Sequence, residues 1–284
     1  YRSNETGNRD ITNIASAPRL VAGLRGLTAG WDWDAALLYS QSKVREQVND
    51  GFPANSLILP ILNSGRVNFF GPNTPDVVAE LRATNFTGDA FNVKSTLSSV
   101  AAKASRELMK LGGGAMGLAL GTEFRHEDYL FDPAPAIQTG DITGYGGNFL
   151  VTDRSRRVAA LFSELNLPVL KGLELNAAVR WDKYEGVGNS TTPKLSARWQ
   201  PLPQVVLRAA IGKGFRAPSL QELYLPQTTG VTGAGTSDPV RCPVTNSRTD
   251  CSTQFAVVNG GNPALTPEKS VNKTLGVVLS PLPQ

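Results

Sequence analysis

The fold is decided by the stretch VVLRAAIGKGFRAPSLQELYLPQTTG, residues 205–230, which changes character in its middle. Its first half alternates, with Val205, Leu207, Ala209 and Ile211 on one side and Arg208 on the other. A period of two is typical of a β-strand with one apolar and one polar face. The second half is rich in glycine, proline and threonine, which predicts that the strand ends there and a long loop follows.

The same alternation recurs along the chain and predicts an all-β protein of about nine strands. Further strands are expected within Gly30–Val44, Ala115–Glu127, Leu173–Tyr184, Pro193–Gln200 and Val271–Leu279. The segment Val158–Leu167 alternates poorly, so its faces are left unassigned. One short helix is expected at Thr74–Thr84, where Pro75 suits the first helical turn.

The connections between these strands differ in length at the two ends of the sheet. Short joins lie at 27–30, 110–114, 168–172 and 200–204, with one more near 186–190. Long, polar joins run over residues 49–90, 131–152 and 214–267. This segregation is typical of an antiparallel transmembrane β-barrel, whereas a soluble β-sandwich rarely sorts its loops by end.

The two faces of the strands support the same interpretation. Trp31, Trp33, Trp181 and Trp199 lie on the apolar face near strand ends, as an interfacial aromatic girdle would. The polar face is too charged for a small packed barrel, which predicts a wide one, either water-filled or plugged. We expect each single charge there to be structural; they are Glu123, Arg125, Glu127, Glu174, Arg180, Asp182, Lys194, Arg198 and Arg208.

Composition excludes several classes of function. The net charge is only +4 and the basic residues are spread singly, so no nucleic-acid partner is expected. One histidine and two cysteines cannot build a Cys–His metal site, and no cofactor is expected. Cys242 and Cys251 lie in a polar loop and favour a local disulfide in an oxidising compartment; two unrelated free thiols, or a metal site, are the alternatives.

The phrase GFRAPSLQELY, Gly214 to Tyr224, resembles the signature of the TonB-dependent outer-membrane receptors. Residues 120–129, 180–201 and 260–281 are similar to other barrel strands of that family, in the same order. The signature positions carried over to this chain are Gly214, Phe215, Arg216, Ala217, Pro218, Ser219, Glu222, Asn262, Pro263, Pro267 and Glu268.

The resemblance implies a barrel of about 22 strands around a separate plug domain, in the outer membrane of a Gram-negative bacterium. It implies active uptake of a scarce nutrient such as a siderophore, cobalamin or glycan. The implied partners are the TonB energising complex, reached through the plug, the nutrient ligand and outer-membrane lipid. Residues 1–284 are expected to be a partial barrel domain, because a plug, a coupling box (TonB box) and the last strands are not recognisable.

Transport of this kind uses no catalytic residues, so the signature is interpreted as structural. Arg216 and Glu222 are expected to form an ion pair at the base of the loop. The loops 214–265 and 49–90 are expected to face the substrate. For Arg241 and Arg248, ligand contact and simple solvation both remain open.

Two other classes of outer-membrane barrel are alternatives to the receptor. One is a passive porin or an adhesin-like barrel. The other is a hydrolase, which would have to use His126, the one histidine, as the base for a serine nucleophile. His126 has the parity of Phe124 and no serine motif nearby, which argues against the hydrolase.

Overall fold

The structure, a computed structural model, describes residues 4–147 and 149–280. Ten strands form one antiparallel sheet, in the order β1-β3-β4-β5-β6-β7-β8-β9-β12, with β2 also paired to β3; β10 and β11 form a separate hairpin. The strands are β1 (Asp10–Ser16), β2 (Arg19–Thr28), β3 (Trp31–Asp50), β4 (Gly88–Leu111), β5 (Gly114–Pro133), β6 (Thr152–Leu170), β7 (Leu173–Tyr184), β8 (Gly188–Leu202), β9 (Val205–Arg216), β10 (Thr228–Val231), β11 (Ala256–Asn259) and β12 (Glu268–Leu279).

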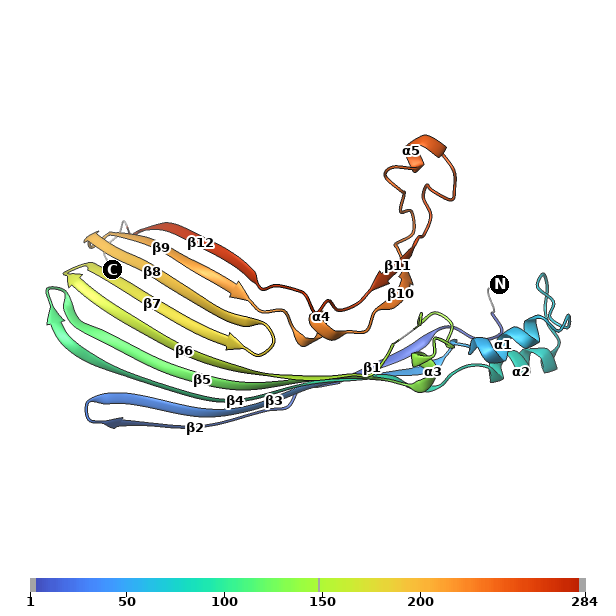
Figure 1. Ribbon diagram of the computed structural model, residues 1–284, viewed down its shortest axis with the longest axis horizontal. Coiled ribbons are helices and arrows are strands. Elements are labelled where there is room, and N and C mark those ends of the chain that lie inside the picture. Colours follow the sequence, from blue (N-terminus) through green and yellow to red (C-terminus); the bar gives the residue numbers. More distant parts are fainter. Residues whose placement is uncertain (1–3, 148, 281–284) are drawn as a thin grey trace.

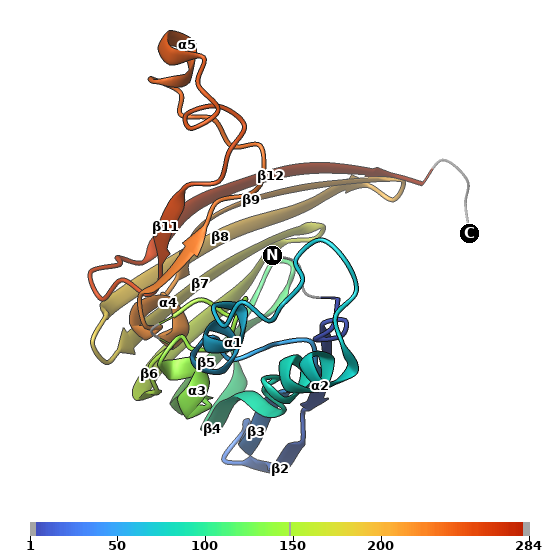
Figure 2. The same ribbon diagram turned by 90° about the vertical axis from the view of Figure 1, so that its right-hand side faces the viewer.

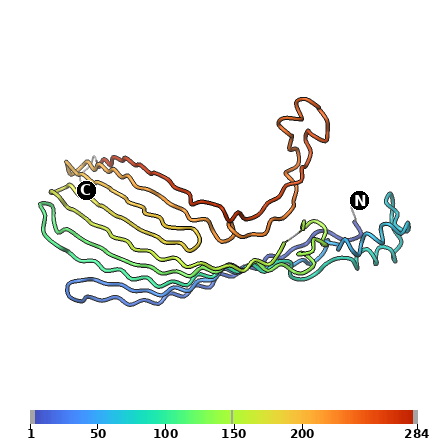
Figure 3. Tube along the Cα trace, viewed as in Figure 1, coloured from blue at the N-terminus to red at the C-terminus, as the bar shows by residue number. Residues whose placement is uncertain are grey.

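The sheet is an open arc rather than a closed barrel (Figures 1 and 2). The short turns β2–β3, β4–β5, β6–β7 and β8–β9 gather at one end, hereafter the turn end, as the chain trace shows (Figure 3). The long connections gather at the other, the loop end. The predicted antiparallel barrel segment is confirmed, with ten strands in the sheet where about nine were expected.

The central strands are longer than a membrane requires. β4 has 24 residues and β3 and β5 have 20 each, whereas a strand crosses a bilayer in about 9–11 residues. The apolar residues of the outer face occupy the half nearer the turn end; on β3 they run from Trp31 to Tyr39. We refer to them as the apolar belt. The remaining half of each long strand supports the loops.

Strand register assigns the two faces. Trp33 lies opposite Ala104, Ala104 opposite Leu120, Leu120 opposite Ser163, and Ser163 opposite Val179. This row and those two residues away form the outer face, whose apolar side chains stay exposed, for example Phe124 at 57% and Leu195 at 58%. All four tryptophans share that face, and the nine charges expected on the polar face all lie on the opposite, inner face.

The segment whose faces the sequence left unassigned lies within β6. Its Phe162 lies on the inner face, opposite Gly121 of β5. A Cβ atom on Gly121 would lie 2.0 Å from the Phe162 ring, so only glycine lets the ring cross this point. Val158 and Ala160 also lie on the inner face, and Ser163 lies on the outer face, so the segment mixes apolar and polar residues on both faces and its alternation is obscured.

The expected helix is present as α2 (Pro75–Ala83), with Pro75 in its first turn. The expectation that all other segments are strand or turn was wrong, because α1 (Asn55–Leu62), α3 (Pro135–Gln138), α4 (Leu220–Tyr224) and α5 (Cys242–Thr245) are also helical. Ile58 of α1 packs with Val77 and Leu81 of α2 in a small core of the loop. Among the described residues, no helix is long and apolar enough to span a membrane.

Candidate functional site

The signature phrase folds into a compact structure at the loop end, which we name the collar: residues 214–224 together with 260–268. Ser219 caps α4 by accepting a hydrogen bond from the Glu222 N–H at 3.1 Å, while the Glu222 carboxylate accepts from the Ser219 N–H at 2.7 Å. This reciprocal capping box satisfies two backbone donors that the first helical turn leaves unpaired. Ala217 and Pro218 lie between the end of β9 and this cap.

Arg216 joins the two halves of the collar. Its guanidinium donates to Glu222 at 2.9 Å and to Glu268, the first residue of β12, at 2.6 Å. Because it lies at the end of β9, this one side chain connects α4 to the paired strand that follows the loop. Gly214, in the same strand, leaves room for Ser270, whose hydroxyl would lie 2.3 Å from a Cβ at that position.

The stability of the collar should depend on pH through the Glu222 carboxylate. Hydrogen bonds from Arg216, and then from Ser219, lower its pKa from the usual 4.5 to about 2. Because the folded pKa is depressed, the stabilisation is full above about pH 4.5 and is lost as the pH falls towards 2. We expect limited proteolysis of the 217–267 loop to accelerate over this interval in the parent protein. Arg216 also lowers the pKa of Glu268, so the Glu222→Gln variant should be cleaved with a smaller pH step than the wild type. A step of unchanged size in the variant would contradict the assignment to Glu222.

The collar rests on the inner face of β5 and β6. Leu220 of α4 is buried with Tyr129 and Phe131 of β5. Arg156 of β6, whose side chain is 9% exposed, pairs with Glu127 at 2.7 Å and donates to the Pro218 carbonyl. A buried guanidinium with both a carboxylate and a carbonyl to bind ties the signature phrase to the wall.

The second signature phrase closes the base of the loop. The Gly261 N–H donates to the Leu225 carbonyl at 2.7 Å, and the Asn262 N–H donates to the Glu222 carbonyl at 2.8 Å. The Asn262 side chain accepts from the Ala264 N–H at 2.9 Å. Pro263 and Pro267 lie in the same return segment, ahead of β12. The two halves of the signature, separated by some forty residues of loop, are thus brought together.

Below the collar, five of the nine charges expected on the inner wall neutralise one another. Arg180 pairs with Glu123 at 2.8 Å and with Asp182 at 3.0 Å. Arg125 lies 3.5 Å from both Glu123 and Glu127, and donates to the Tyr184 hydroxyl at 3.1 Å. These five charges thus have the structural role that was expected of them, whereas no ion pair of Glu174, Lys194, Arg198 or Arg208 is found within the described residues. The carboxylates that hold Arg125 and Arg180 lie on β5 and β7.

The loop end carries an aromatic cluster beside the collar. Phe91 lies 5.3 Å from Phe131 and from Phe149, and 5.5 Å from Tyr145, between ring centroids. The Tyr145 hydroxyl donates to Glu46 at 2.8 Å, and burial together with this bond raises the pKa of Tyr145. The loop 134–151 is therefore fixed on the long strands and is not a free chain.

A polar pocket of about 860 Å³ opens next to α1. The Arg9 guanidinium lies at this pocket, 5.2 Å from the Phe52 ring centroid. Amide and hydroxyl side chains, among them Asn8, Asn55 and Thr143, line one part of it, and apolar residues of α1 such as Ile58 and Leu62 line another. Such donors and acceptors can bind a polar ligand at the loop end.

The hairpin β10–β11 projects from the collar and ends in a small head around α5 (Figure 1). Cys242 and Cys251 form a disulfide in this head, with their Cα atoms 5.1 Å apart. Arg241 lies 3.5 Å from Asp250 of the same head, whereas Arg248 is exposed. Of the two arginines whose role was left open, Arg241 is thus engaged within the loop itself.

A family model described as "TonB dependent receptor-like, beta-barrel" matches residues 2–282, nearly the whole chain. The chain belongs to the TonB-dependent receptor family. The resemblance carried by the signature phrase is thereby confirmed, and members of this family are outer-membrane β-barrels of Gram-negative bacteria.

Named relatives of this TonB-dependent receptor barrel are siderophore receptors. The ferric enterobactin receptor of Pseudomonas aeruginosa is 29% identical over 259 residues, which is 88% of this chain and 29% of that protein. The probable TonB-dependent siderophore receptor PirA of Acinetobacter baumannii is 29% identical over 56% of this chain and 20% of its own. A crystal structure of a mutant of the Pseudomonas receptor superposes with a TM-score of 0.62 at 23% identity, covering 95% of this chain and 33% of that one. The chain spans less than a third of the curated relatives that it matches.

Sequence reasoning missed two parts of this receptor's collar. The helix α4 carried a readable signal, because Ser219 and Glu222 have the Ser-x-x-Glu spacing of a capping box. Arg156 carried no such sequence signal, because its partner Glu127 belongs to another strand.

His126 lies 3.0 Å from Asp128 on the outer face, away from the collar. The described residues contain no cluster of metal-ligating side chains.

Proposed function

We propose that this chain is part of an outer-membrane receptor that binds a ferric siderophore at the cell surface and imports it with energy from the TonB complex. The observation that carries the proposal is the similarity to a ferric enterobactin receptor over 88% of the chain. Named relatives in this family are transport receptors, which supports a non-enzymatic role.

In this proposal the loops at the loop end meet the ligand, and the polar wall below them lines its path. The α1–α2 loop, the 134–151 loop and the β10–β11 hairpin provide the surface that would meet the ligand, with Arg9 and the amides of its pocket among the contacts. The collar holds these loops on the wall through Arg216 and Arg156. The wall below is polar, as a path for a hydrated ligand requires.

We also propose that residues 1–284 supply only part of a barrel whose other strands and plug belong to a longer parent protein. The open arc supports this, since β12 at one edge and β1 and β2 at the other have one side without a partner strand in the described chain. Edge strands in a bilayer leave backbone groups unpaired, which closure of a barrel removes.

Uptake by the parent protein tests the proposal. The parent gene is expressed in a Gram-negative strain that lacks its own siderophore and siderophore receptors, and growth in iron-limited medium is followed. We expect ferric enterobactin or another ferric siderophore to restore growth, and an uncoupler of the proton gradient to abolish uptake of the radiolabelled complex. Uptake that persists with the uncoupler would indicate a passive porin instead. No rescue by any ferric siderophore would overturn the ligand class.

A further inference from the structure

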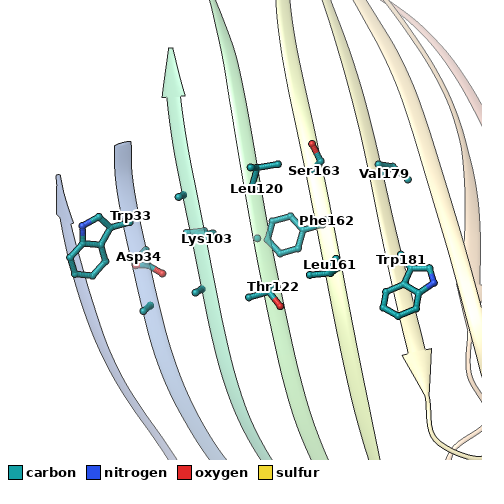
Figure 4. A pocket seen from close by; sticks show the side chains of 14 residues that line it. Trp33, Asp34, Lys103, Leu120, Thr122, Leu161, Phe162, Ser163, Val179 and Trp181 are labelled. Carbon is teal, nitrogen blue, oxygen red and sulfur yellow. The ribbon is translucent and has the colours of Figure 1, made fainter. Parts of the chain in front are cut away.

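The pocket next to α1, hereafter the α1 pocket, depends on loops for its shape. In contrast, the hollow in the apolar belt between Trp33 and Trp181 is lined by side chains of β3 to β7, which the hydrogen bonds of the sheet hold in place (Figure 4). No lining residue of the α1 pocket lies in a strand of the described chain; they come from the segments 4–9 and 51–53, from α1 and from the 134–151 loop. The way in which these segments are fastened to one another therefore decides how precisely the pocket can bind a ligand.

Helix α1 is weak on its own. It has eight residues, Ala54 at its N-cap makes no side-chain cap, and its first turn has no acidic residue. Pro60, inside the helix, has no N–H with which to continue the backbone hydrogen bonds. Isolated helices of this length are marginal in water, so the position of α1 must come from contacts with other parts of the chain.

Asp141 of the 134–151 loop supplies the missing cap. Its two carboxylate oxygens accept hydrogen bonds from the Ser56 N–H at 2.7 Å and from the Ser56 hydroxyl at 2.6 Å. Its backbone carbonyl accepts from the Asn55 N–H at 2.7 Å. A carboxylate at this end of a helix satisfies unpaired N–H groups and interacts favourably with the helix dipole. A residue 85 positions along the chain from Ser56 therefore fixes the start of α1.

The two residues after Asp141 extend this junction. Ile142 pairs with Ala54 in an antiparallel bridge, and the Ile142 side chain is buried, 2% exposed, in a core that includes Ala54. The Thr143 N–H donates to the Pro53 carbonyl at 3.0 Å. The 134–151 loop is thus bonded along the chain that leads into α1, with Asp141 at the helix end of the junction.

The junction leads directly to the α1 pocket. The Thr143 hydroxyl donates to the Asn55 side-chain oxygen at 3.0 Å, and both residues line the pocket. Ile58 and Leu62, which line its apolar part, belong to α1, as Asn55 does. A shift of the first turn of α1 would therefore move both the polar and the apolar lining of the pocket relative to Thr143.

We propose that Asp141 is a positioning residue for ligand binding: it sets α1 against the 134–151 loop and so holds the α1 pocket in the shape that the ligand meets. The inference rests on the proposed function, because it takes this pocket to contact the siderophore. Within the described chain Asp141 does not line the pocket, so it acts on the ligand through Asn55, Thr143 and α1 and not by contact.

Uptake kinetics of the full-length parent test the proposal. Radiolabelled ferric enterobactin is the probe, and the KM and the maximal rate of uptake are measured in cells that lack other siderophore receptors. Asp141→Ala should raise the KM about tenfold and leave the maximal rate unchanged, because the loss of a helix cap is here expected to weaken binding and not energised release. A fall in the maximal rate with a wild-type KM would indicate fewer assembled receptors and would overturn the proposal.

Two more conservative variants refine this comparison. Asp141→Asn keeps an oxygen that can accept from the Ser56 N–H and should have a KM close to the wild-type value; a KM as high as that of Asp141→Ala would contradict positioning through these hydrogen bonds. If Asp141→Ala is not assembled, Ser56→Ala makes the test, because it removes the hydroxyl bond alone. Its KM should rise by less than that expected for Asp141→Ala, and an unchanged KM would overturn the proposal.

Asp76 provides the matched control. It lies in the first turn of α2, in the same long loop as α1, and does not line the pocket in the described chain. Asp76→Ala removes a carboxylate from the start of a helix without touching the junction with the 134–151 loop, so the KM should stay at the wild-type value. An equal rise in KM for Asp76→Ala and Asp141→Ala would show general loosening of the loop and would overturn the role given to Asp141.

Hydrogen exchange of the purified parent without ligand separates this inference from the proposed function. Asp141→Ala should speed exchange both in α1 and at residues 141–143, whereas Asp76→Ala should speed it in α2 alone. Unchanged exchange at residues 141–143 in Asp141→Ala would overturn the inference whatever the ligand is. Absence of ferric enterobactin uptake by the wild type, with exchange as expected, would count against the proposed function and leave the role of Asp141 in shaping the pocket supported.

Discussion

Replacing Arg156 with alanine is expected to release the collar from the barrel wall and to lower the free energy of unfolding by about 3–5 kcal/mol. Arg156 is buried and pairs with Glu127 at 2.7 Å. It also binds the Pro218 carbonyl and lies 5.3 Å from the centroid of the Tyr184 ring. Truncation leaves the Pro218 carbonyl without this donor and leaves Glu127 with only its 3.5 Å contact to Arg125. The under-satisfied groups carry the main part of the cost.

The neighbouring Arg154 is the matched control. It lies two residues along the same face of β6, is exposed, and lies over the Tyr224 ring at 5.4 Å. Denaturant unfolding of the parent barrel in micelles should show a change below about 1 kcal/mol for Arg154→Ala. The double variant Arg156→Ala, Glu127→Ala should recover part of the lost free energy of unfolding, because the Glu127 carboxylate is then absent. Equal losses at the two arginines would show that Arg156 has no special part in anchoring the collar.

Six of the ten strands in the sheet, β3, β5, β7, β8, β9 and β12, could be predicted because each carries its own alternation, whereas β1, β2 and β4 were not among the strands expected from alternation and β6 alternates poorly. In β9, the placement of Val205, Leu207, Ala209 and Ile211 on one side and Arg208 on the other needs no information from the rest of the chain. The same holds for the segregation of short turns from long loops. Phe162 of β6 shows what such a local pattern cannot predict. Its place on the inner face depends on the absence of a side chain at Gly121, which belongs to another strand.

The arrangement within the loops depends on contacts between distant residues, which no local pattern encodes. Tyr145 and Glu46 are 99 residues apart and Arg216 and Glu268 are 52 apart, yet each pair forms a hydrogen bond. In α1, the apolar run is short and contains Pro60, so it resembles loop sequence until the contact with α2 is known. The signature phrases could be placed together only through their resemblance to the family, since spacing alone says nothing of their meeting.

A methyl group at Gly261 is expected to open the base of the ligand-facing loop. Gly261 is buried, and a Cβ there would lie 2.6 Å from the Leu225 nitrogen and 2.7 Å from the Leu223 carbonyl carbon. These are backbone atoms of α4 and of its C-cap residue, and they cannot rotate away. Gly261→Ala must therefore displace the return segment and break its bond to the Leu225 carbonyl. We expect a loss of about 1–3 kcal/mol in stability and faster proteolysis of the 217–267 loop.

Gly230→Ala in β10 is the control, because its new methyl would meet nothing closer than 3.9 Å. Siderophore affinity should fall only in the Gly261 variant if the collar orients the β10–β11 hairpin. Unchanged affinity despite a loosened loop would mean that the hairpin contributes nothing to ligand binding.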